Sequence, residues 1–176
     1  PGGLLSSAVE ISDRFIDSGP IVYTEGSVGR RRSIPRARRH GTYPAMPLVI
    51  LINHASASAS EIVAGAVQDH GQGESWWEKP LVIGTRSFGK GSVQDLFPLS
   101  SRKAFLKLTT QYYKLPLGRI IHRNPDSAQW GIEPDLVVTM TAKQIVDAIQ
   151  IRQELDILRD ENDQVAPDDD PDAAAL

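Results

Sequence analysis

The fold is decided by a stretch at residues 48–62, which reads LVILINHASASASEI. Its first five residues are a continuous apolar run, which predicts a strand covered on both faces. The alternating Ala and Ser residues that follow carry little side-chain bulk, and from Glu61 to His70 the apolar positions recur at helical spacing. The stretch therefore predicts a buried strand that leads through a small-residue turn into a helix, with Ser58 at the junction.

A second stretch, LVIGTRSFGKGSVQ at residues 81–94, also begins with an apolar run but continues into a glycine-rich segment. Leu81-Val82-Ile83 predicts another buried strand, and Lys90 follows it between two glycines. A hydroxyl at one strand end and an amine at another are a common arrangement in α/β hydrolytic sites. Because a lysine acts as a base only when neutral, we expect Phe88 and the glycines to allow the desolvation of Lys90, with the neutral amide of Gln94 orienting it. The alternative is a solvated surface lysine, the usual setting of this residue type.

The same residues nearly form a phosphate-binding loop, G-x-x-x-x-G-K-[ST], with Gly84, Gly89 and Lys90 at the required spacing. The last position of the motif fails because Gly91 has no hydroxyl for magnesium. The run at residues 48–52 ends in Asn53, where a nucleotide-binding strand would carry an Asp. The sequence therefore favours a base over a phosphate ligand at Lys90.

Composition limits the other classes of function. The chain has 176 residues, 40% hydrophobic and 23% charged, which is enough for one core. A net charge of -3 gives no general attraction to nucleic acid. The absence of cysteine excludes disulfides, thiolate zinc sites and a Cys nucleophile, and the four histidines lack zinc spacing. No apolar run approaches the roughly 20 residues that a membrane helix needs.

The remaining pattern alternates helices and strands and predicts an α/β fold with a mixed sheet. A capping box at Thr141 and Gln144 marks the start of the last helix. The further expected elements are a helix over 4–16, strands over 20–24, 104–113 and 136–138, and a loop over 26–45.

Three polar or aromatic features receive structural interpretations. The basic residues of 30–39 are expected to form a solvated loop rather than a site for nucleic acid or phosphate. His54 is expected to satisfy a backbone group rather than pair with Ser58. Trp76 and Trp77 mark either a partner contact or a loop that packs on its own domain. We expect residues 1–163 to form one domain and the acidic residues 164–176 to form a disordered tail.

Five ordered motifs resemble the C-terminal processing, or tail-specific, serine proteases. They are Pro1–Leu4 (PGGL), Ser56–Ile62 (SASASEI), Phe88–Gln94 (FGKGSVQ), Leu106–Thr110 (LKLTT) and Gly131–Asp135 (GIEPD). The resemblance implies an α/β fold akin to ClpP and the crotonases, and a Ser/Lys dyad. Residue by residue, it implies Ser58 as nucleophile, Lys90 as general base and Gln94 as the residue that positions the lysine, with an oxyanion hole of backbone N–H groups from Gly2 or Gly3 and from Ala59.

The resemblance further implies hydrolysis of peptide bonds through an acyl-enzyme, without metal or cofactor. Its expected substrates are proteins or peptides with exposed C-termini, and its bacterial members work in the periplasm or cell envelope. Membrane association is expected only through segments outside these 176 residues. Family members also carry a PDZ domain and segments upstream of the Gly-Gly pair, neither of which lies in this sequence. The gap between Ser58 and Lys90 is longer than usual because of residues 73–79, and Ala55 stands where the family has Gly.

Two other functions remain as alternatives. One is a catalytically silent scaffold or binding domain of the same fold, against which the joint presence of Ser58, Lys90 and Gln94 argues. The other is a crotonase-like acyl-CoA enzyme, a class that relies on pairs of oxyanion-binding N–H groups and acidic residues and has no use for a Ser/Lys dyad.

Overall fold

The structure is a computed structural model that describes residues 2–26, 34–44, 46–71, 79–99 and 104–155. It divides into two units, Pro1–Thr139 and Met140–Leu176. The predicted domain boundary at residue 163, the predicted disordered tail, Arg30–Arg32 and Trp76–Trp77 all lie outside the described residues. Those expectations therefore stay predictions.

The stretch at residues 48–62 folds as its sequence predicts. Strand β4 (Val49–Ile52) ends at a turn that leads into helix α2 (Ala59–His70), and strand β5 (Leu81–Gly84) returns parallel to β4. Strand β8 (Leu136–Val137) pairs with β5 in parallel, so the strand order is β4-β5-β8. Close approach of β4 and β5 requires glycine at Gly84, because a Cβ there would lie 1.9 Å from the carbonyl oxygen of Ile52.

The antiparallel strands form separate sheets. Strand β7 (Phe105–Lys114) lies between β2 (Tyr23–Gly26) and β6 (Ser92–Pro98), and the short strands β1 (Gly19–Pro20) and β3 (Arg36–Ala37) pair with each other. The predicted α/β class with both strand directions is confirmed. Parallel and antiparallel pairs occupy different sheets of the described structure, rather than one mixed sheet.

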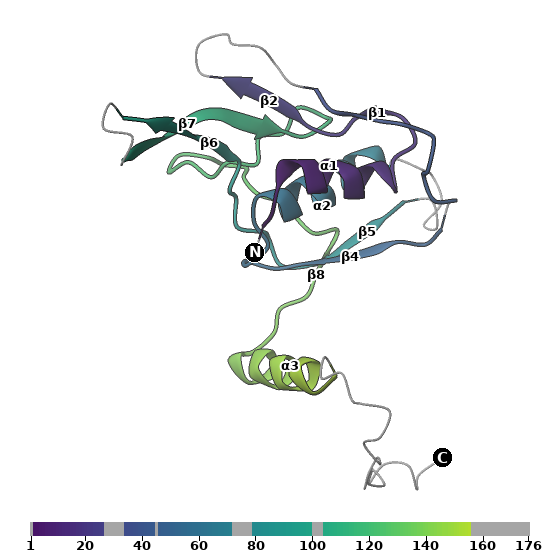
Figure 1. The fold of residues 1–176 in the computed structure, drawn as a ribbon. Coiled ribbons are helices and arrows are strands. Elements are labelled where there is room, and N and C mark those ends of the chain that lie inside the picture. Colours follow the sequence, from purple (N-terminus) through teal and green to yellow (C-terminus); the bar gives the residue numbers. More distant parts are fainter. Residues whose placement is uncertain (1, 27–33, 45, 72–78, 100–103, 156–176) are drawn as a thin grey trace, which may run out of the picture. The chain divides into compact units, whose positions relative to one another are not determined.

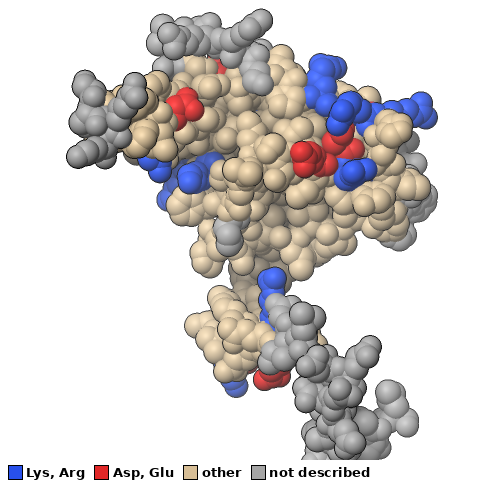
Figure 2. Space-filling model, viewed as in Figure 1, with Lys and Arg blue, Asp and Glu red and all other residues tan. Residues whose placement is uncertain are grey.

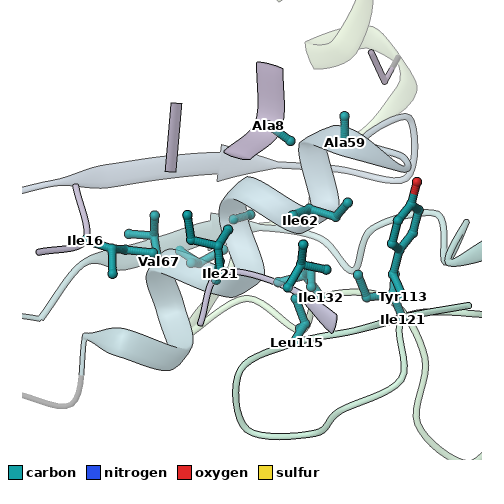
Figure 3. Close-up of a cluster of buried hydrophobic side chains, with 14 of the residues drawn as sticks. Ala8, Ile16, Ile21, Ala59, Ile62, Val67, Tyr113, Leu115, Ile121 and Ile132 are labelled. Atoms are coloured by element: carbon teal, nitrogen blue, oxygen red, sulfur yellow. The ribbon is translucent and has the colours of Figure 1, made fainter. Parts of the chain in front are cut away.

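Within the first unit, helices α1 (Leu5–Asp13) and α2 lie between the two three-stranded sheets (Figure 1). The two helices pack on each other and fill the space between the sheets with apolar side chains. Figure 3 shows part of this core, in which the fully buried side chains include Ile21, Ile62, Leu115, Ile121 and Ile132. The core thus fixes α2, whose first residue follows Ser58.

One prediction about β4 is wrong. Ile52 is buried and Ile50 packs against the core, but Val49 is 55% exposed and Leu51 76% exposed. The helices of this unit cover one face of the β4-β5-β8 sheet, so alternate side chains point away from them. Within the described residues of this unit, one face of β4 is therefore left uncovered, although the strand is apolar throughout.

The second unit contributes helix α3 (Ala142–Leu155). Its predicted capping box is confirmed, because the Thr141 N–H donates to Gln144 Oε1 at 2.9 Å and the Gln144 N–H donates to Thr141 Oγ1 at 3.3 Å. Among the described residues, no helix combines the length and apolar character needed to cross a membrane.

Candidate active site

The turn before Ser58 is built by the side chains of Asn53 and Ser56. The Ala55 N–H donates to Asn53 Oδ1 at 2.9 Å, and Ser56 Oγ accepts from the Asn53 N–H at 3.1 Å. Such local side-chain bonds are the usual way in which Asn and Ser stabilise a turn. The hydroxyl of Ser56 is thus occupied by turn formation. His54 is exposed on this turn.

Ser58 is the N-cap residue of α2 and has an unusual backbone conformation, with φ 58° and ψ -117°. It is the one residue other than glycine with positive φ in the described part of the chain. A non-glycine residue in such a region is strained, and strain of this kind occurs often at functional sites. The half-buried serine lies where the N–H groups and positive dipole end of a helix favour negative charge.

The structure brings Gly2 beside Ser58 and Ala59, as the sequence prediction requires. A Cβ placed on Gly2 would lie 2.8 Å from the carbonyl oxygen of Ala57, 3.0 Å from Ser58 Cβ and 3.5 Å from the Ala59 nitrogen. A Cβ on Gly3 would instead make an ordinary contact, 3.9 Å from the Ala59 side chain. Of the two glycines, Gly2 is therefore the one whose lack of a side chain the packing requires.

Lys90 lies in the segment that the structure brings to the start of α2, but its setting differs from the prediction. Its side chain is exposed, and Phe88, which was expected to allow its desolvation, is 57% exposed. Ser58 Oγ and Lys90 Nζ form no hydrogen bond with each other within the described structure. The expected exclusion of water from Lys90 is thus not provided by the described residues, since its side chain is exposed among them.

A buried carboxylate joins the segments of Ser58 and Lys90. Glu61 is fully buried, and its Oε2 atom accepts from the Ser58 N–H at 2.7 Å and from the Lys90 N–H at 2.8 Å. Its Oε1 atom accepts from the Gly89 N–H and from Ser87 Oγ, both at 2.6 Å. All four contacts fix a buried charge, which is stable only when so bonded.

Sequence reasoning missed this role of Glu61. It identified the residue as part of a helix start, which is correct, since Glu61 occupies the third position of α2 and accepts the N–H of its N-cap. The available signal was an acidic residue among apolar positions of the helix core face. A carboxylate on such a face needs several donors, and the glycine-rich segment supplies two of the four, the N–H groups of Gly89 and Lys90.

Gln94 lies on β6, opposite Thr109 of β7, and is exposed. The register between the strands shifts between Val93 and Gln94. A bulge of this kind redirects the side chains that follow it and occurs often beside active sites. The structure thus places Gln94 on the strand that follows Lys90, and within the described residues no hydrogen bond joins the two side chains.

Tyr113 of β7 packs beside the same segment. Its N–H donates to the Gly91 carbonyl at 2.7 Å, and its ring belongs to the core. Burial raises the pKa of the Tyr113 phenol above 10.0, and the negative charge of Asp95 raises it further. The phenol is therefore neutral over the physiological pH range and contributes no charge near Lys90.

The described residues contain no group of three or more His, Cys, Asp or Glu side chains placed to hold a metal ion. Lys and Arg side chains gather near a smaller group of acidic ones on the face that Figure 2 shows. In the described part of the basic segment, Arg38 pairs with Asp13 of α1 at 3.3 Å. This pair ties the residue that follows β3 to α1, in keeping with the structural interpretation of that segment.

Comparison with known proteins identifies the family. The sequence model of peptidase family S41 matches residues 1–138, and the chain belongs to that family. The carboxy-terminal-processing protease of Bartonella bacilliformis is 44% identical over 140 residues, which cover 78% of this chain and 29% of the relative. The carboxyl-terminal-processing protease of Picosynechococcus sp. is 39% identical over 138 residues, covering 78% of this chain and 30% of the relative.

A solved structure agrees with these sequence matches. The photosystem II D1 C-terminal processing protease is 33% identical, with a TM-score of 0.65, and the match covers 78% of this chain and 32% of that protein. The predicted family and α/β fold are confirmed. The chain spans less than a third of the length of these relatives.

Proposed function

We propose that this chain carries the catalytic site of a serine endopeptidase that uses Ser58 and Lys90 as a dyad. The observation that carries the proposal is the single carboxylate of Glu61, which binds the backbone N–H groups of both residues. Two distant segments are thereby held together at a strained helix N-terminus. Membership of peptidase family S41 supports the same class of reaction.

In the proposed reaction, Lys90 accepts the proton of Ser58 Oγ while that oxygen attacks the carbonyl carbon of a peptide bond. The N–H groups of Gly2 or Gly3 and of Ala59 hold the negative oxygen of the tetrahedral intermediate. Protonated Lys90 then donates to the departing amine, leaving an ester on Ser58. A water molecule gives a proton to Lys90 and attacks the ester, and Lys90 then donates that proton to the released Ser58 oxygen, which restores both side chains.

Lys90 must lose its ordinary charge to begin this sequence. A lysine exposed to water stays protonated, whereas burial disfavours the charged form. We propose that the bound substrate covers the exposed Lys90 and Phe88 side chains and so provides the desolvation that the described residues do not. Gln94 then holds the amine without adding the negative charge that would keep it protonated.

We propose protein or peptide substrates cleaved near their C-termini, because relatives that match at 44% and 39% identity are named for carboxy-terminal processing. A bacterial periplasm or cell envelope is the proposed location, in line with the bacterial relatives. Neither metal nor cofactor is needed by the proposed chemistry.

The test is cleavage of an unfolded protein with an apolar C-terminus by wild type, Ser58→Ala and Lys90→Ala, monitored by mass spectrometry. Cleavage by wild type that both substitutions abolish supports the dyad. Cleavage that persists in Ser58→Ala contradicts it. If no form cleaves and none reacts with a serine-directed probe, the chain is a silent domain of the same fold.

A further inference from the structure

The GIEPD motif, Gly131–Asp135, has no chemical part in the proposed reaction, yet the structure connects it to the dyad. The connection is Ser87, which is 1% exposed. Its Oγ donates to Glu61 Oε1 at 2.6 Å and accepts from the Ile132 N–H at 2.7 Å. A buried chain of hydrogen bonds thus runs from Ile132 through Ser87 to the carboxylate that binds Ser58 and Lys90.

The direction of this chain follows from chemistry. A backbone N–H only donates, and an ionised carboxylate only accepts, so the single hydroxyl proton of Ser87 must point to Glu61. Hydrogen bonds to a charged acceptor are the stronger kind. Ser87 therefore holds one carboxylate oxygen in place, which leaves Glu61 Oε2 facing the N–H groups of Ser58 and Lys90.

The far end of the chain is fixed by the fold. Asp135 Oδ2 accepts from the Val82 N–H at 2.9 Å, and the Asp135 N–H donates to the Val82 carbonyl at 2.8 Å, which fastens the motif to β5. The carbonyl of Glu133 accepts from Gln68 Nε2 of α2 at 3.0 Å. The motif is thus attached to the strand and the helix that frame the site.

We propose that Ser87 is a positioning residue for the reaction, which transmits the fixed position of Gly131–Asp135 through Glu61 to Ser58 and Lys90. The inference rests on the proposed function, because positioning has an effect on rate only where the dyad reacts. Misplacement of reacting groups by about 1 Å costs as much as 100-fold in rate. Among the described residues, Ser87 forms no hydrogen bond to Ser58 or Lys90, so its effect passes through Glu61.

The first test is Ser87→Ala, with Ser12→Ala as the matched control. Ser12 is also fully buried, but its Oγ has no hydrogen-bond partner among the residues that the structure describes. The readout is the rate at which a small fluorophosphonate modifies Ser58, measured on protein that circular dichroism shows to be folded. We expect a loss of about 10- to 100-fold for Ser87→Ala and an unchanged rate for Ser12→Ala.

A second pair of variants disturbs the same contact without removing the hydroxyl. Gly131 and Gly118 both have positive φ, at 63° and 84°, so Gly→Ala strains the backbone at each. A Cβ on Gly131 would lie 2.8 Å from Ser87 Oγ, whereas one on Gly118 meets no atom within 4 Å. We expect Gly131→Ala to slow the modification of Ser58 and Gly118→Ala to leave it unchanged.

The outcomes separate this inference from the proposed function. Wild type that fails to react at Ser58 overturns the proposed function and the inference with it. Wild type that reacts, with folded Ser87→Ala or Gly131→Ala reacting at the wild-type rate, overturns the inference alone and leaves Ser87 a structural hydrogen bond. Slow reaction in these two variants, with both controls unchanged, supports positioning.

Discussion

The carboxylate of Glu61 accepts the backbone N–H of Lys90 at 2.8 Å, although 29 residues separate them in sequence. The same oxygen accepts the N–H of Ser58. The relative position of the two proposed catalytic residues is therefore held by one buried carboxylate, together with the hydrogen bond from the Phe88 N–H to the Ser56 carbonyl at 2.9 Å. Side-chain contact between nucleophile and base is not needed to hold their segments together in the free protein.

Glu61→Gln is expected to destabilise the fold and abolish activity together. An amide offers one oxygen in place of two and turns its own N–H groups toward some of the four donors that Glu61 binds. Unsatisfied buried donors cost about 1–3 kcal/mol each, so the free energy of unfolding should fall by about 2–4 kcal/mol. Urea denaturation measures this loss.

The matched control for Glu61 is Glu133→Gln. Glu133 pairs with Arg86, but its side chain is 56% exposed. An exposed pair contributes about 0–1 kcal/mol. Equal losses of stability in the two variants would contradict the central role assigned to Glu61.

Gly2→Ala should slow acylation of Ser58 far more than Gly3→Ala. The new Cβ at position 2 lies 3.0 Å from Ser58 Cβ, whereas the one at position 3 makes only an ordinary contact with Ala59. Loss of one oxyanion donor costs about 100- to 1000-fold, and displacement of Gly2 should approach that range. Single-turnover kinetics with an activated ester measures it, and similar rates in both variants would exclude Gly2 from the oxyanion hole.

Ser58→Gly should be more stable than Ser58→Ala, although both lose the nucleophile. The backbone at this position has φ 58°, which glycine adopts without strain. Strain at a non-glycine residue costs about 1–3 kcal/mol, and the greater freedom of glycine in the unfolded chain offsets about 0.4–1 kcal/mol of it. Thermal unfolding of the two variants decides the point. Equal stability would mean that Ser58 is not strained in solution.

Stability should fall as the pH rises above about 10 because of Tyr113. Its pKa in the folded protein is raised by burial and by Asp95, so the folded state keeps the phenolic proton at pH values where the unfolded state releases it. The unfolded state then binds fewer protons, and the free energy of unfolding decreases with pH. At lower pH the contribution of Tyr113 to the free energy of unfolding is fully present and does not change with pH.

Denaturant titration across the alkaline range measures this effect, with Tyr113→Phe as the comparison. The variant should lose the part of the alkaline decline that Tyr113 causes. Tyr43, which is 53% exposed, provides a control in Tyr43→Phe. An alkaline decline that is the same in wild type and Tyr113→Phe would show that the phenol is not shielded from water.

Local sequence rules predicted the strand-turn-helix around Ser58 and the capping box of α3, because each depends on residues close in sequence. They failed for the outer face of β4, since apolarity does not report what lies against Leu51. They also missed Ser87 and Glu61 as partners. Their contact depends on how the segment after β5 folds back onto α2, which no short-range pattern encodes.

The proposed roles of Ser58 and Lys90 rest on a different source. The strand-end patterns pointed to these positions, the motif resemblance assigned their roles, and the structure adds that both N–H groups reach one carboxylate. What the sequence suggested incorrectly was the desolvation of Lys90 beside Phe88. Whether the Lys90 side chain is exposed depends on which other parts of the fold pack over it. The sequence of the glycine-rich segment around Lys90 does not specify those parts.

The most direct test of the dyad is the site and rate of modification by a fluorophosphonate, mapped to a single residue by peptide mass spectrometry. The reagent needs only an activated serine and the oxyanion hole. We expect modification of Ser58 in wild type, none in Ser58→Ala, and a strongly reduced rate in Lys90→Ala, with Lys107→Ala unchanged as an exposed lysine control. Modification of Ser56 or Ser60 instead, or an undiminished rate in Lys90→Ala, would contradict the proposed site.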